Sequence, residues 1–363
     1  MTRAWFTISV SETTGYREIA QRAALFERIA PRCHVNGDAR WQRALRIIRA
    51  KRGGRNAAFP VCCAVMFGLL NLNKPSGRTS RDVVNRVQRL VRPAKVGHAG
   101  TLDPLASGVL VVCLGPATRL VPILHELPKV YRGTFRWGCA SESDDVESDV
   151  TQLTDAPQLT APALESVLPE FLGTIEQVPP SFSAVKIGGR RAYKLARAGN
   201  EVRPPPRRVE IHRLELLELD ADMFRLEIEC GTGTYVRSLG RDIAVRLGSG
   251  AVMTELTRVS IGPFDLADSV PVDRLGSLAD IDESAVPPLA AINDWPRCEV
   301  DASGLELLRN GRPVPAHGSA EEGTRVAIVA GEGGLVAIGE QRGDEVHPKQ
   351  VFITVRGAER NRA

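Results

Sequence analysis

The sequence predicts an α+β protein with a C-terminal part made only of β-structure. Short apolar runs typical of strands, such as 66–73 and 109–114, are interspersed with segments whose apolar residues recur at helical spacing, such as 83–91. From about Trp295 onward the chain contains short strand-like runs separated by turns, for example 325–330. A chain of 363 residues is long enough for two or three such domains.

The remaining elements follow from the same spacing rules. The sequence predicts a turn at 74–80, a helix over 115–127, a strand over 129–140, a helix over 160–171, strands over 209–219 and 224–230, and a helix that follows 231–239 and runs to Leu247. Five acidic residues lie between 141 and 149, and such a run is most simply a solvated loop.

Composition excludes several classes of protein. At 43% hydrophobic and 25% charged residues the chain has the composition of a soluble globular protein. No apolar run approaches a membrane span, and the start lacks the features of a secretory signal. Seven dispersed cysteines without a C-x-x-C pair argue against a disulfide framework or a zinc site. Cys113, Cys139 and Cys230 lie in strand-like runs, so we expect buried thiols and a cytoplasmic location.

Positive charge is concentrated at the start of the chain. Residues 1–65 contain twelve Lys or Arg and four Asp or Glu, a net charge of +8. The remainder of the chain contains 35 Lys or Arg and 39 Asp or Glu, a net charge of −4. The segment could be a basic helix that binds RNA or a membrane surface, or a transit peptide, or the natural start could be Met66. In each case we expect it to be poorly ordered. RNA binding by the rest of the chain would need a local basic groove.

One loop, residues 95–110, organises the predicted elements around it. It contains three glycines, a proline and a single carboxylate, Asp103. The glycines permit positive φ and close backbone approach, and Pro104 stiffens the chain directly after Asp103. On these grounds alone, Asp103 could either cap local N–H groups in a turn or serve as a reactive carboxylate.

The loop reads G-H-x-G-T-L-D-P-x-A-x-G-x-L from Gly97 and resembles the catalytic loop of the TruB family of tRNA pseudouridine synthases. Further stretches resemble the same family: K-P-x-G-x-T-S from Lys74, K-x-Y-R from Lys129, P-P-x-x-S-A-x-K ending at Lys186, and G-T-Y-V-R ending at Arg237. The resemblance extends over roughly residues 66–355 and does not include residues 1–65.

The resemblance implies a fold and an activity. It implies a pseudouridine synthase catalytic domain with a mixed, mainly antiparallel sheet over 66–290, and a small PUA-like RNA-binding β-barrel over 291–357. It also implies that the protein isomerises a uridine in the T-loop of tRNA (position 55 in tRNA numbering) to pseudouridine. The expected partner is therefore the tRNA T-arm, with no membrane, no obligate protein partner and a monomeric enzyme.

Pseudouridine formation breaks the C1′–N1 glycosidic bond, turns the uracil and rejoins it through C5. The step involves neither redox chemistry nor a phosphate bond, so we expect no cofactor and no metal. It does need a carboxylate beside the sugar and the base, as a nucleophile or to stabilise positive charge at C1′. The resemblance assigns this role to Asp103, and whether it attacks the sugar or the base stays open.

The resemblance also supplies substrate-binding residues. A carboxylate in a closed pocket tends to take up a proton unless it is paired, and Arg237 is the expected partner of Asp103. The target uridine must leave the stacked loop, and we expect Tyr131 to stack on it, Tyr235 to form a second wall and His98 to occupy the vacated space. Tyr131 could instead be a core residue and Arg237 a surface one.

Three further residues complete the predicted site. Leu256 lies in a stretch similar to the end of the family's catalytic domain, and Lys74 and Lys186 are candidate phosphate contacts. Two other functions stay open: a guide-RNA-dependent rRNA synthase of the dyskerin type, and a tRNA-binding or tRNA-folding protein without catalysis. The absence of a basic C-terminal tail and the presence of a complete set of site residues favour the stand-alone tRNA enzyme.

Overall fold

The computed structural model describes residues 66–353, except for 184, 188, 193–194, 196–201, 203, 317–319 and 332, and it does not describe the side chains of 186, 187, 190 and 191. The described residues all belong to one compact unit, Ala64–Ala363. The expectations for residues 1–65 lie outside the described residues.

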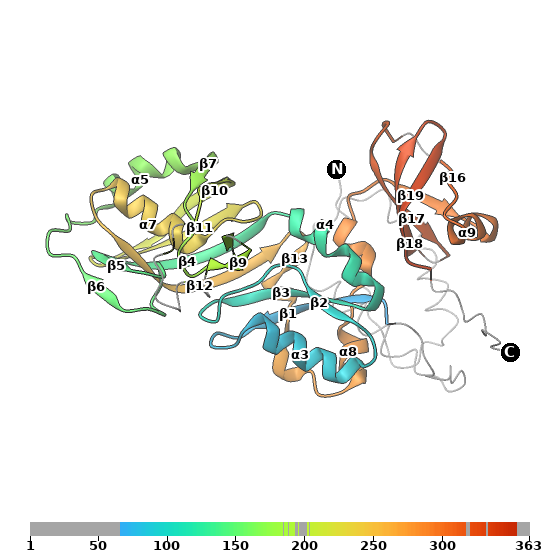
Figure 1. Ribbon diagram of the computed structural model, residues 1–363, viewed down its shortest axis with the longest axis horizontal. Helices are drawn as coiled ribbons and strands as arrows, with labels where there is room; N and C mark the ends of the chain where they lie inside the picture. Colours follow the sequence, from blue (N-terminus) through green and yellow to red (C-terminus); the bar gives the residue numbers. More distant parts are fainter. Residues whose placement is uncertain are drawn as a thin grey trace, which may run out of the picture. The chain divides into compact units, whose positions relative to one another are not determined.

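A ten-stranded sheet forms the larger part of the described chain (Figure 1). Its order is β14 (Val270–Pro271), β1 (Gly68–Lys74), β3 (Ser107–Leu114), β12 (Ala251–Ile261), β4 (Lys129–Trp137), β11 (Met223–Cys230), β10 (Arg207–Leu219) and β7 (Gly173–Gln177). Strands β2 (Val96–His98) and β13 (Phe264–Asp265) pair with β3 and β12. Two pairings on the main path, β1 with β14 and β12 with β3, are parallel and the others are antiparallel. The predicted mixed, mainly antiparallel sheet is therefore confirmed.

Helix α3 (Ser80–Val91) begins where the sequence predicts. Thr79 and Asp82 form a reciprocal capping box, which satisfies N–H groups that the first helical turn leaves free. Val83, Val87 and Val91 lie on one face of α3 and are buried in an apolar cluster with residues of the sheet strands β1 and β3.

Helix α7 (Val236–Arg246) covers the other half of the sheet. Gly240 lets it approach closely, because a Cβ there would lie 2.1 Å from the ring of Phe135. Phe135 stacks on Phe224 of the neighbouring strand with ring centroids 5.0 Å apart. Such aromatic pairs add roughly 0.5–1.5 kcal/mol beyond their buried area. Helix α7 is thereby fixed over β4, which matters because it carries Arg237.

The other helices are short. They are α4 (Val121–Glu126) after the 3₁₀ turn Gly115–Leu120, α5 (Ala161–Val167) before the 3₁₀ turn Leu168–Phe171, and α8 (Leu278–Ser284); further 3₁₀ turns are Leu266–Asp268, Val272–Arg274 and Pro288–Ile292. Among the residues that the structure describes, no helix has the length and apolar character of a membrane span.

The C-terminal part is a nearly closed five-stranded barrel, as the family resemblance implies, but it also contains a helix that the sequence pattern did not predict. Its order is β15 (Arg297–Val300), β17 (Arg325–Ala330), β18 (Gly334–Arg342), β19 (Glu345–Val351) and β16 (Val314–Pro315), with helix α9 (Ala302–Arg309) beside it. Phe352, after β19, stacks on Phe67 and also lies under the guanidinium of Arg119, 4.6 Å from its ring centroid. These contacts join the barrel to the large sheet.

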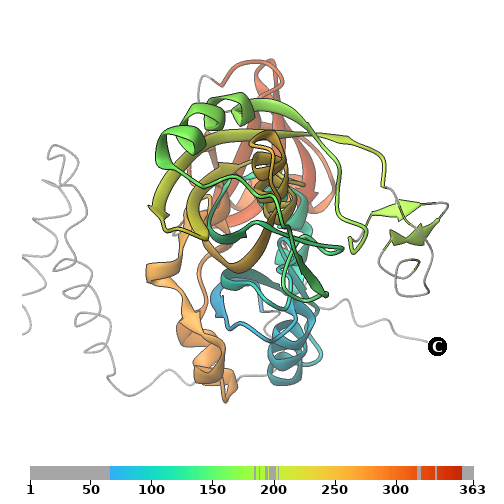
Figure 2. The same cartoon turned by 90° about the vertical axis from the view of Figure 1, so that its left-hand side faces the viewer.

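Two short hairpins stand apart from the large sheet. Strands β5 (Cys139–Ser141) and β6 (Val150–Gln152) flank the acidic run, and β8 (Lys186–Ile187) and β9 (Arg190–Arg191) form a second hairpin that projects from the body of the unit (Figure 2). The expected burial of Cys113, Cys139 and Cys230 is confirmed. Burial raises the pKa of Cys113 to about 12, so it is an inert core thiol.

Candidate active site

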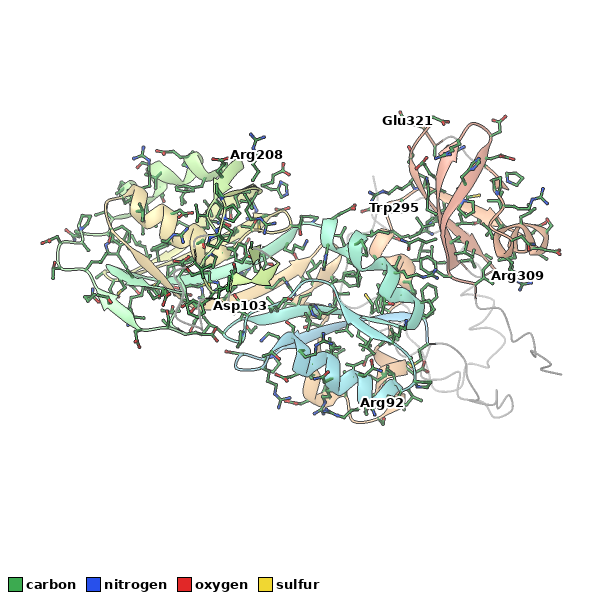
Figure 3. The ribbon with its side chains drawn as sticks, in the orientation of Figure 1. Arg92, Asp103, Arg208, Trp295, Arg309 and Glu321 are labelled. Carbon is green, nitrogen blue, oxygen red and sulfur yellow. The ribbon has the colours of Figure 1, made fainter. Side chains whose placement is uncertain are left out.

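The loop that carries Asp103 is fastened to the start of α3. The Ser80 hydroxyl accepts a hydrogen bond from the Leu102 amide, 2.8 Å, and the Gly77 amide donates to the Pro104 carbonyl, 2.8 Å. Asp103 therefore sits between two anchored neighbours, while its own side chain keeps 37% of its surface exposed. It lies at the middle of the large sheet, away from the barrel residues Trp295 and Arg309 (Figure 3).

The predicted pairing of Asp103 with Arg237 is present. Arg237 Nη2 lies 3.1 Å from Asp103 Oδ2, and the arginine side chain is only 7% exposed. The same nitrogen donates to the Phe182 carbonyl at 3.2 Å, and Nη1 donates to the Ser143 carbonyl at 3.0 Å. A buried guanidinium with several fixed acceptors cannot swing freely, so Arg237 presents its charge to Asp103 in one orientation.

The prediction of a solvated loop over 141–149 is wrong for two residues. Asp144 and Asp145 are 5% and 0% exposed, and each pairs with an arginine of α7. Asp145 Oδ2 lies 3.0 Å from Arg237 Nη1, and its Oδ1 accepts from the Ser143 hydroxyl at 2.5 Å. The run looks solvated because its acidic residues are close in sequence, but their counterions are about ninety residues away.

Tyr131 lies on β4 directly opposite Arg258 of β12. The guanidinium carbon of Arg258 is 6.0 Å from the Tyr131 ring centroid, and Nε donates to the Val109 carbonyl at 2.7 Å. Burial raises the pKa of Tyr131, so its hydroxyl stays protonated at neutral pH. Arg258, only 1% exposed, is a site neighbour for which the sequence analysis predicts no role.

Lys74 is fully buried beneath the Asp103 loop. Its ammonium donates to three carbonyls, those of Pro75 at 2.9 Å, Arg78 at 2.5 Å and Pro104 at 3.3 Å. Burial lowers the pKa of Lys74 to about 8, and the nearby charge of Asp103 opposes that shift. These bonds occupy the three N–H donors and tie the turn at the start of α3 to the loop. Lys74 therefore has no N–H left for the phosphate contact that the sequence analysis expects.

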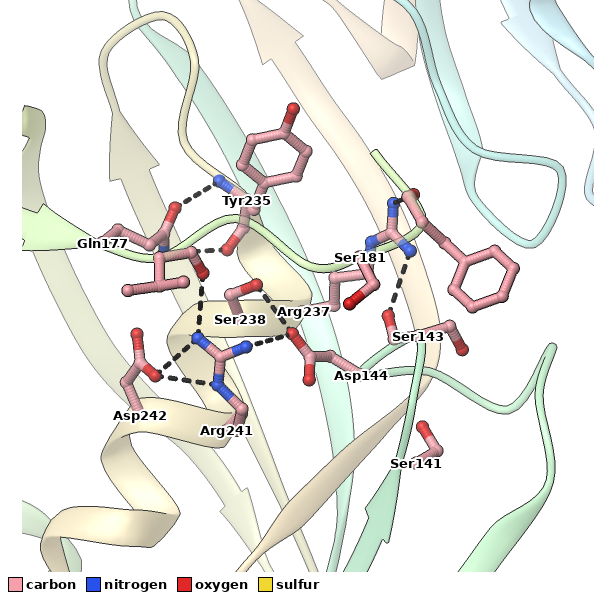
Figure 4. Close-up of polar contacts among 12 residues, drawn as sticks. Ser141, Ser143, Asp144, Gln177, Ser181, Tyr235, Arg237, Ser238, Arg241 and Asp242 are labelled. Atoms are coloured by element: carbon pink, nitrogen blue, oxygen red, sulfur yellow. Dashed lines mark hydrogen bonds and ion pairs between the residues drawn. The ribbon is translucent and has the colours of Figure 1, made fainter. Parts of the chain in front are cut away.

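Tyr235 precedes the first turn of α7, and the Gln177 side chain forms two hydrogen bonds with its backbone. The Gln177 side chain donates to the Tyr235 carbonyl at 3.0 Å and accepts from the Tyr235 amide at 2.8 Å (Figure 4). Arg207 lies over the ring, with its guanidinium carbon 5.9 Å from the centroid. The close approach of Arg207 needs Gly233, where a Cβ would lie 2.2 Å from its Nη2.

The other predicted site residues are His98, Leu256 and Lys186. His98 ends β2, and burial together with Arg258 and Arg81 lowers its pKa. Leu256 is 8% exposed and belongs to the apolar cluster that also contains Leu102. Lys186 lies on β8, and its side chain is outside the description. In this described part of the chain, no three His, Cys, Asp or Glu side chains gather as metal ligands.

Several solved structures have a similar fold. One is a chain of the crystal structure of a Cbf5-Nop10-Gar1 complex, with a TM-score of 0.61, 28% identity, and coverage of 80% of this chain and 86% of that one. Another comes from the structure of an H/ACA RNP bound to a substrate RNA containing 2′-deoxyuridine, with a TM-score of 0.61 and 25% identity over the same shares.

Sequence comparison adds closer relatives. Residues 88–236 match the TruB family pseudouridylate synthase (N terminal domain). The tRNA pseudouridine synthase B of Sinorhizobium medicae (strain WSM419) is 41% identical over 296 residues, 78% of this chain and 95% of the relative. That of Dehalococcoides mccartyi is 40% identical over 296 residues, 80% and 97% of the two chains. The chain therefore belongs to the TruB family and is a tRNA pseudouridine synthase, an isomerase.

Proposed function

We propose that this synthase converts the uridine at position 55 in the T-loop of tRNA to pseudouridine, with Asp103 as its catalytic carboxylate. The observation that carries the proposal is the pair of Asp103 and Arg237. The carboxylate is partly exposed and accessible to a substrate, whereas the guanidinium 3.1 Å away is buried and fixed. A fixed positive charge beside the carboxylate holds it in one orientation and leaves its exposed side open to the sugar and the base.

The reaction redistributes bonds within one nucleotide. The C1′–N1 bond breaks, the uracil turns, and a C1′–C5 bond forms; C5 then loses its proton and N1 gains one. Asp103 supplies the electron pair or the negative charge that the electron-poor intermediate needs. Tyr131, neutral and positioned by Arg258, is suited to stack on the uracil and to exchange a proton with it.

We further propose that the uridine leaves the T-loop stack to reach Asp103. Tyr131 and Tyr235 would flank the flipped base, His98 would take its place in the loop, and Leu256 would contribute an apolar surface. Lys74 supports this site from below by holding the loop to α3. Lys186, on the β8–β9 hairpin, is proposed to bind a backbone phosphate.

The proposed organisation follows the fold. Residues 66–290 form the catalytic domain, and the barrel within 291–357 binds RNA outside the T-loop. The substrate is the tRNA T-arm, the enzyme is a monomer that needs no protein partner, and it acts in the cytoplasm. Residues 1–65 are proposed to be dispensable for catalysis.

The test is direct. The purified chain is incubated with an unmodified tRNA transcript and with its isolated T-arm hairpin, and pseudouridine is mapped along both. We expect modification at the T-loop uridine of both RNAs. Asp103→Asn should lower turnover more than about a hundredfold and leave hairpin binding unchanged. Turnover within tenfold of the wild type would exclude Asp103, and modification elsewhere would exclude the proposed substrate position.

A further inference from the structure

Two consecutive aspartates hold two arginines that are one helical turn apart on α7. Asp145 pairs with Arg237, and Asp144 pairs with Arg241 at 2.7 Å. Each arginine also donates to a main-chain carbonyl in Val178–Ser183: Arg237 donates to Phe182 at 3.2 Å and Arg241 to Val178 at 3.0 Å. We call residues Val178–Ser183 the hairpin root, because they precede the β8–β9 hairpin. No described hydrogen bond or ion pair joins the second aspartate–arginine pair to Asp103 or Arg237, although the nearby charge of Arg237 also acts to lower the pKa of Asp144.

Every part of the Arg241 guanidinium is occupied (Figure 4). Nη1 bonds to Asp144 Oδ2, Nε donates to Asp242 Oδ1 at 2.9 Å, and Nη2 bonds to Asp242 Oδ1 at 2.8 Å as well as to the Val178 carbonyl. A planar guanidinium can serve these partners at once, whereas a lysine ammonium cannot. Arg241 is thus built into the fold although 27% of its side chain is exposed.

Asp144 is held in an unusual conformation. Its φ of +61° lies in the left-handed region, which aspartate tolerates better than most residues. Its side chain is 6% exposed and accepts from the Ser238 hydroxyl at 2.8 Å. Burial raises the pKa of Asp144, and Arg241 and Ser238 oppose that shift by stabilising the charged form. A left-handed backbone conformation and a buried charge at one residue both cost free energy. The contacts of Asp144 with Arg241 and Ser238 offset this cost.

The hairpin root connects α7 to the base of the hairpin. The Ser181 hydroxyl donates to the Val202 carbonyl at 2.8 Å. Phe182 packs against Ala192 and Val202, which are 0% and 7% exposed and form a small apolar cluster of their own. The root is therefore fixed on one side to α7 by two arginines and on the other to the segment that follows β9.

We propose that Asp144 and Arg241 are a positioning pair for tRNA binding: they hold the hairpin root on α7 and so present the β8–β9 hairpin to the T-arm. The pair acts on affinity, because a root that is already fixed loses less conformational freedom when RNA binds. The neighbouring pair, Asp145 and Arg237, includes the contact to Asp103 and acts on the chemical step. This inference rests on the proposed tRNA substrate site.

The experiment measures the Kd for the T-arm hairpin and the single-turnover rate at saturating enzyme. Arg241→Gln and Asp144→Asn should each raise the Kd about tenfold, the loss expected for one charge-assisted hydrogen bond, with saturated rates close to the wild type. The double variant should bind no more weakly than Arg241→Gln, because that substitution alone already removes the Asp144–Arg241 contact. Arg241→Lys keeps the charge, so its Kd should lie between those of the wild type and Arg241→Gln. Amide hydrogen exchange should be faster in the hairpin root of Arg241→Gln.

The matched control is Arg246→Gln. Arg246 is on the same helix and pairs with Glu170 at the surface, 2.7 Å, so its loss removes one positive charge without touching the root. The Kd of Arg246→Gln and its amide hydrogen exchange in the hairpin root should match those of the wild type. Thermal unfolding checks that each variant is folded at the assay temperature. If Arg241→Gln or Asp144→Asn is unfolded there, Arg241→Lys is measured in its place.

Three results would overturn the proposal. If Asp144→Asn binds normally while Arg241→Gln binds weakly with a salt slope smaller by about one, Arg241 contacts a phosphate directly. If the variants lower the saturated rate and leave the Kd unchanged, the pair serves the catalytic loop. If neither quantity changes, the pair is structural only. A wild-type chain that does not modify the T-arm at all would instead refute the proposed function, while binding and exchange would still report on the root.

Discussion

Asp145 is fully buried and its Oδ2 lies 3.0 Å from Nη1 of Arg237, the nitrogen next to the Nη2 that faces Asp103. The guanidinium thus contacts two carboxylates, one fully buried and one partly exposed. A buried guanidinium without Asp145 would keep Asp103 as its remaining carboxylate partner and be drawn toward it. Asp145 therefore fixes how far Arg237 extends, and with it the position of the Asp103 carboxylate.

Replacing Asp145 should impair the chemical step. Asp145→Asn keeps the shape of the side chain but removes its charge, so we expect turnover to fall about a hundredfold while the Kd for the T-arm hairpin stays within threefold. Stability should fall by about 3 kcal/mol, because a buried arginine loses a charged partner. Single-turnover kinetics and urea unfolding measure both effects.

The control for this variant is Asp149→Asn, in the same acidic run but exposed. It changes the net charge equally and should leave rate and stability unchanged. Equal effects of the two substitutions would mean that the charge of the run, and not the Asp145–Arg237 contact, is what matters.

Gly108 marks the place where β3 meets β12 in parallel. Its φ is +101°, and a Cβ there would lie 2.2 Å from the Arg258 carbonyl oxygen and 2.9 Å from its nitrogen. Gly108→Ala should therefore destabilise the protein by more than about 2 kcal/mol, because backbone strain and a backbone clash add. Gly108→Ala should also lower activity, because Arg258 is paired with Tyr131 on the neighbouring strand β4.

Gly173→Ala separates the two causes. Gly173 also has positive φ, +78°, but nothing lies within 4 Å of its Cβ position. We expect a loss of only about 1 kcal/mol, from the backbone conformation alone. If both alanine variants lose the same stability in urea unfolding, the close approach at Gly108 is not what makes glycine necessary.

Local patterns predicted those parts of the site that depend on neighbours in sequence. The helix over 83–91, the strand 109–114 and the helix after Tyr235 are present because apolar spacing and caps act over a few residues. The family motifs led to the Asp103–Arg237 pair. By contrast, nothing in the local sequence indicates that Asp144 and Asp145 are buried, because their arginine partners lie about ninety residues later.

Arg258 shows that contacts between strands also cannot be predicted from the local sequence pattern. Its neighbours Val109 and Tyr131 are set by the parallel pairing of β12 with β3 and the antiparallel pairing with β4. Pairing partners depend on the whole topology and cannot be read from alternation within one strand. One signal was available: Arg237 and Arg241, four apart at the start of a helix, lie where positive charge is unfavourable, so acidic partners are needed.

Lys74 predicts a pH dependence of stability. Its pKa in the folded protein is about 8, against 10.5 for an exposed lysine, so between these values the unfolded chain binds more protons. The free energy of unfolding contributed by this group therefore rises with pH across that window. Lys74→Met lacks the contribution, so its deficit relative to the wild type should grow by roughly 1–2 kcal/mol between pH 7.5 and 10.

Urea unfolding at both pH values measures this difference. Lys129, whose pKa burial also lowers to about 8, is present in both proteins, so its contribution cancels. A deficit that stays constant or shrinks with rising pH would show that Lys74 titrates as an ordinary lysine.

Removing residues 1–65 should leave catalysis on the T-arm hairpin within about twofold of the full chain. All the described site residues lie after Met66, and the compact unit that contains them begins at Ala64. The removed segment has a net charge of +8, so binding to full-length tRNA should weaken at low salt. That loss should shrink as salt rises, because exposed charges are screened over about 10 Å at 0.1 M.

The two substrates and two salt concentrations separate the possible roles of the segment. A loss confined to full-length tRNA at low salt assigns the segment to nonspecific attraction of RNA. A large loss of turnover on the hairpin at high salt cannot come from screened charges. It would mean that residues 1–65 contribute directly to the catalytic unit, and that this unit does not begin near Met66.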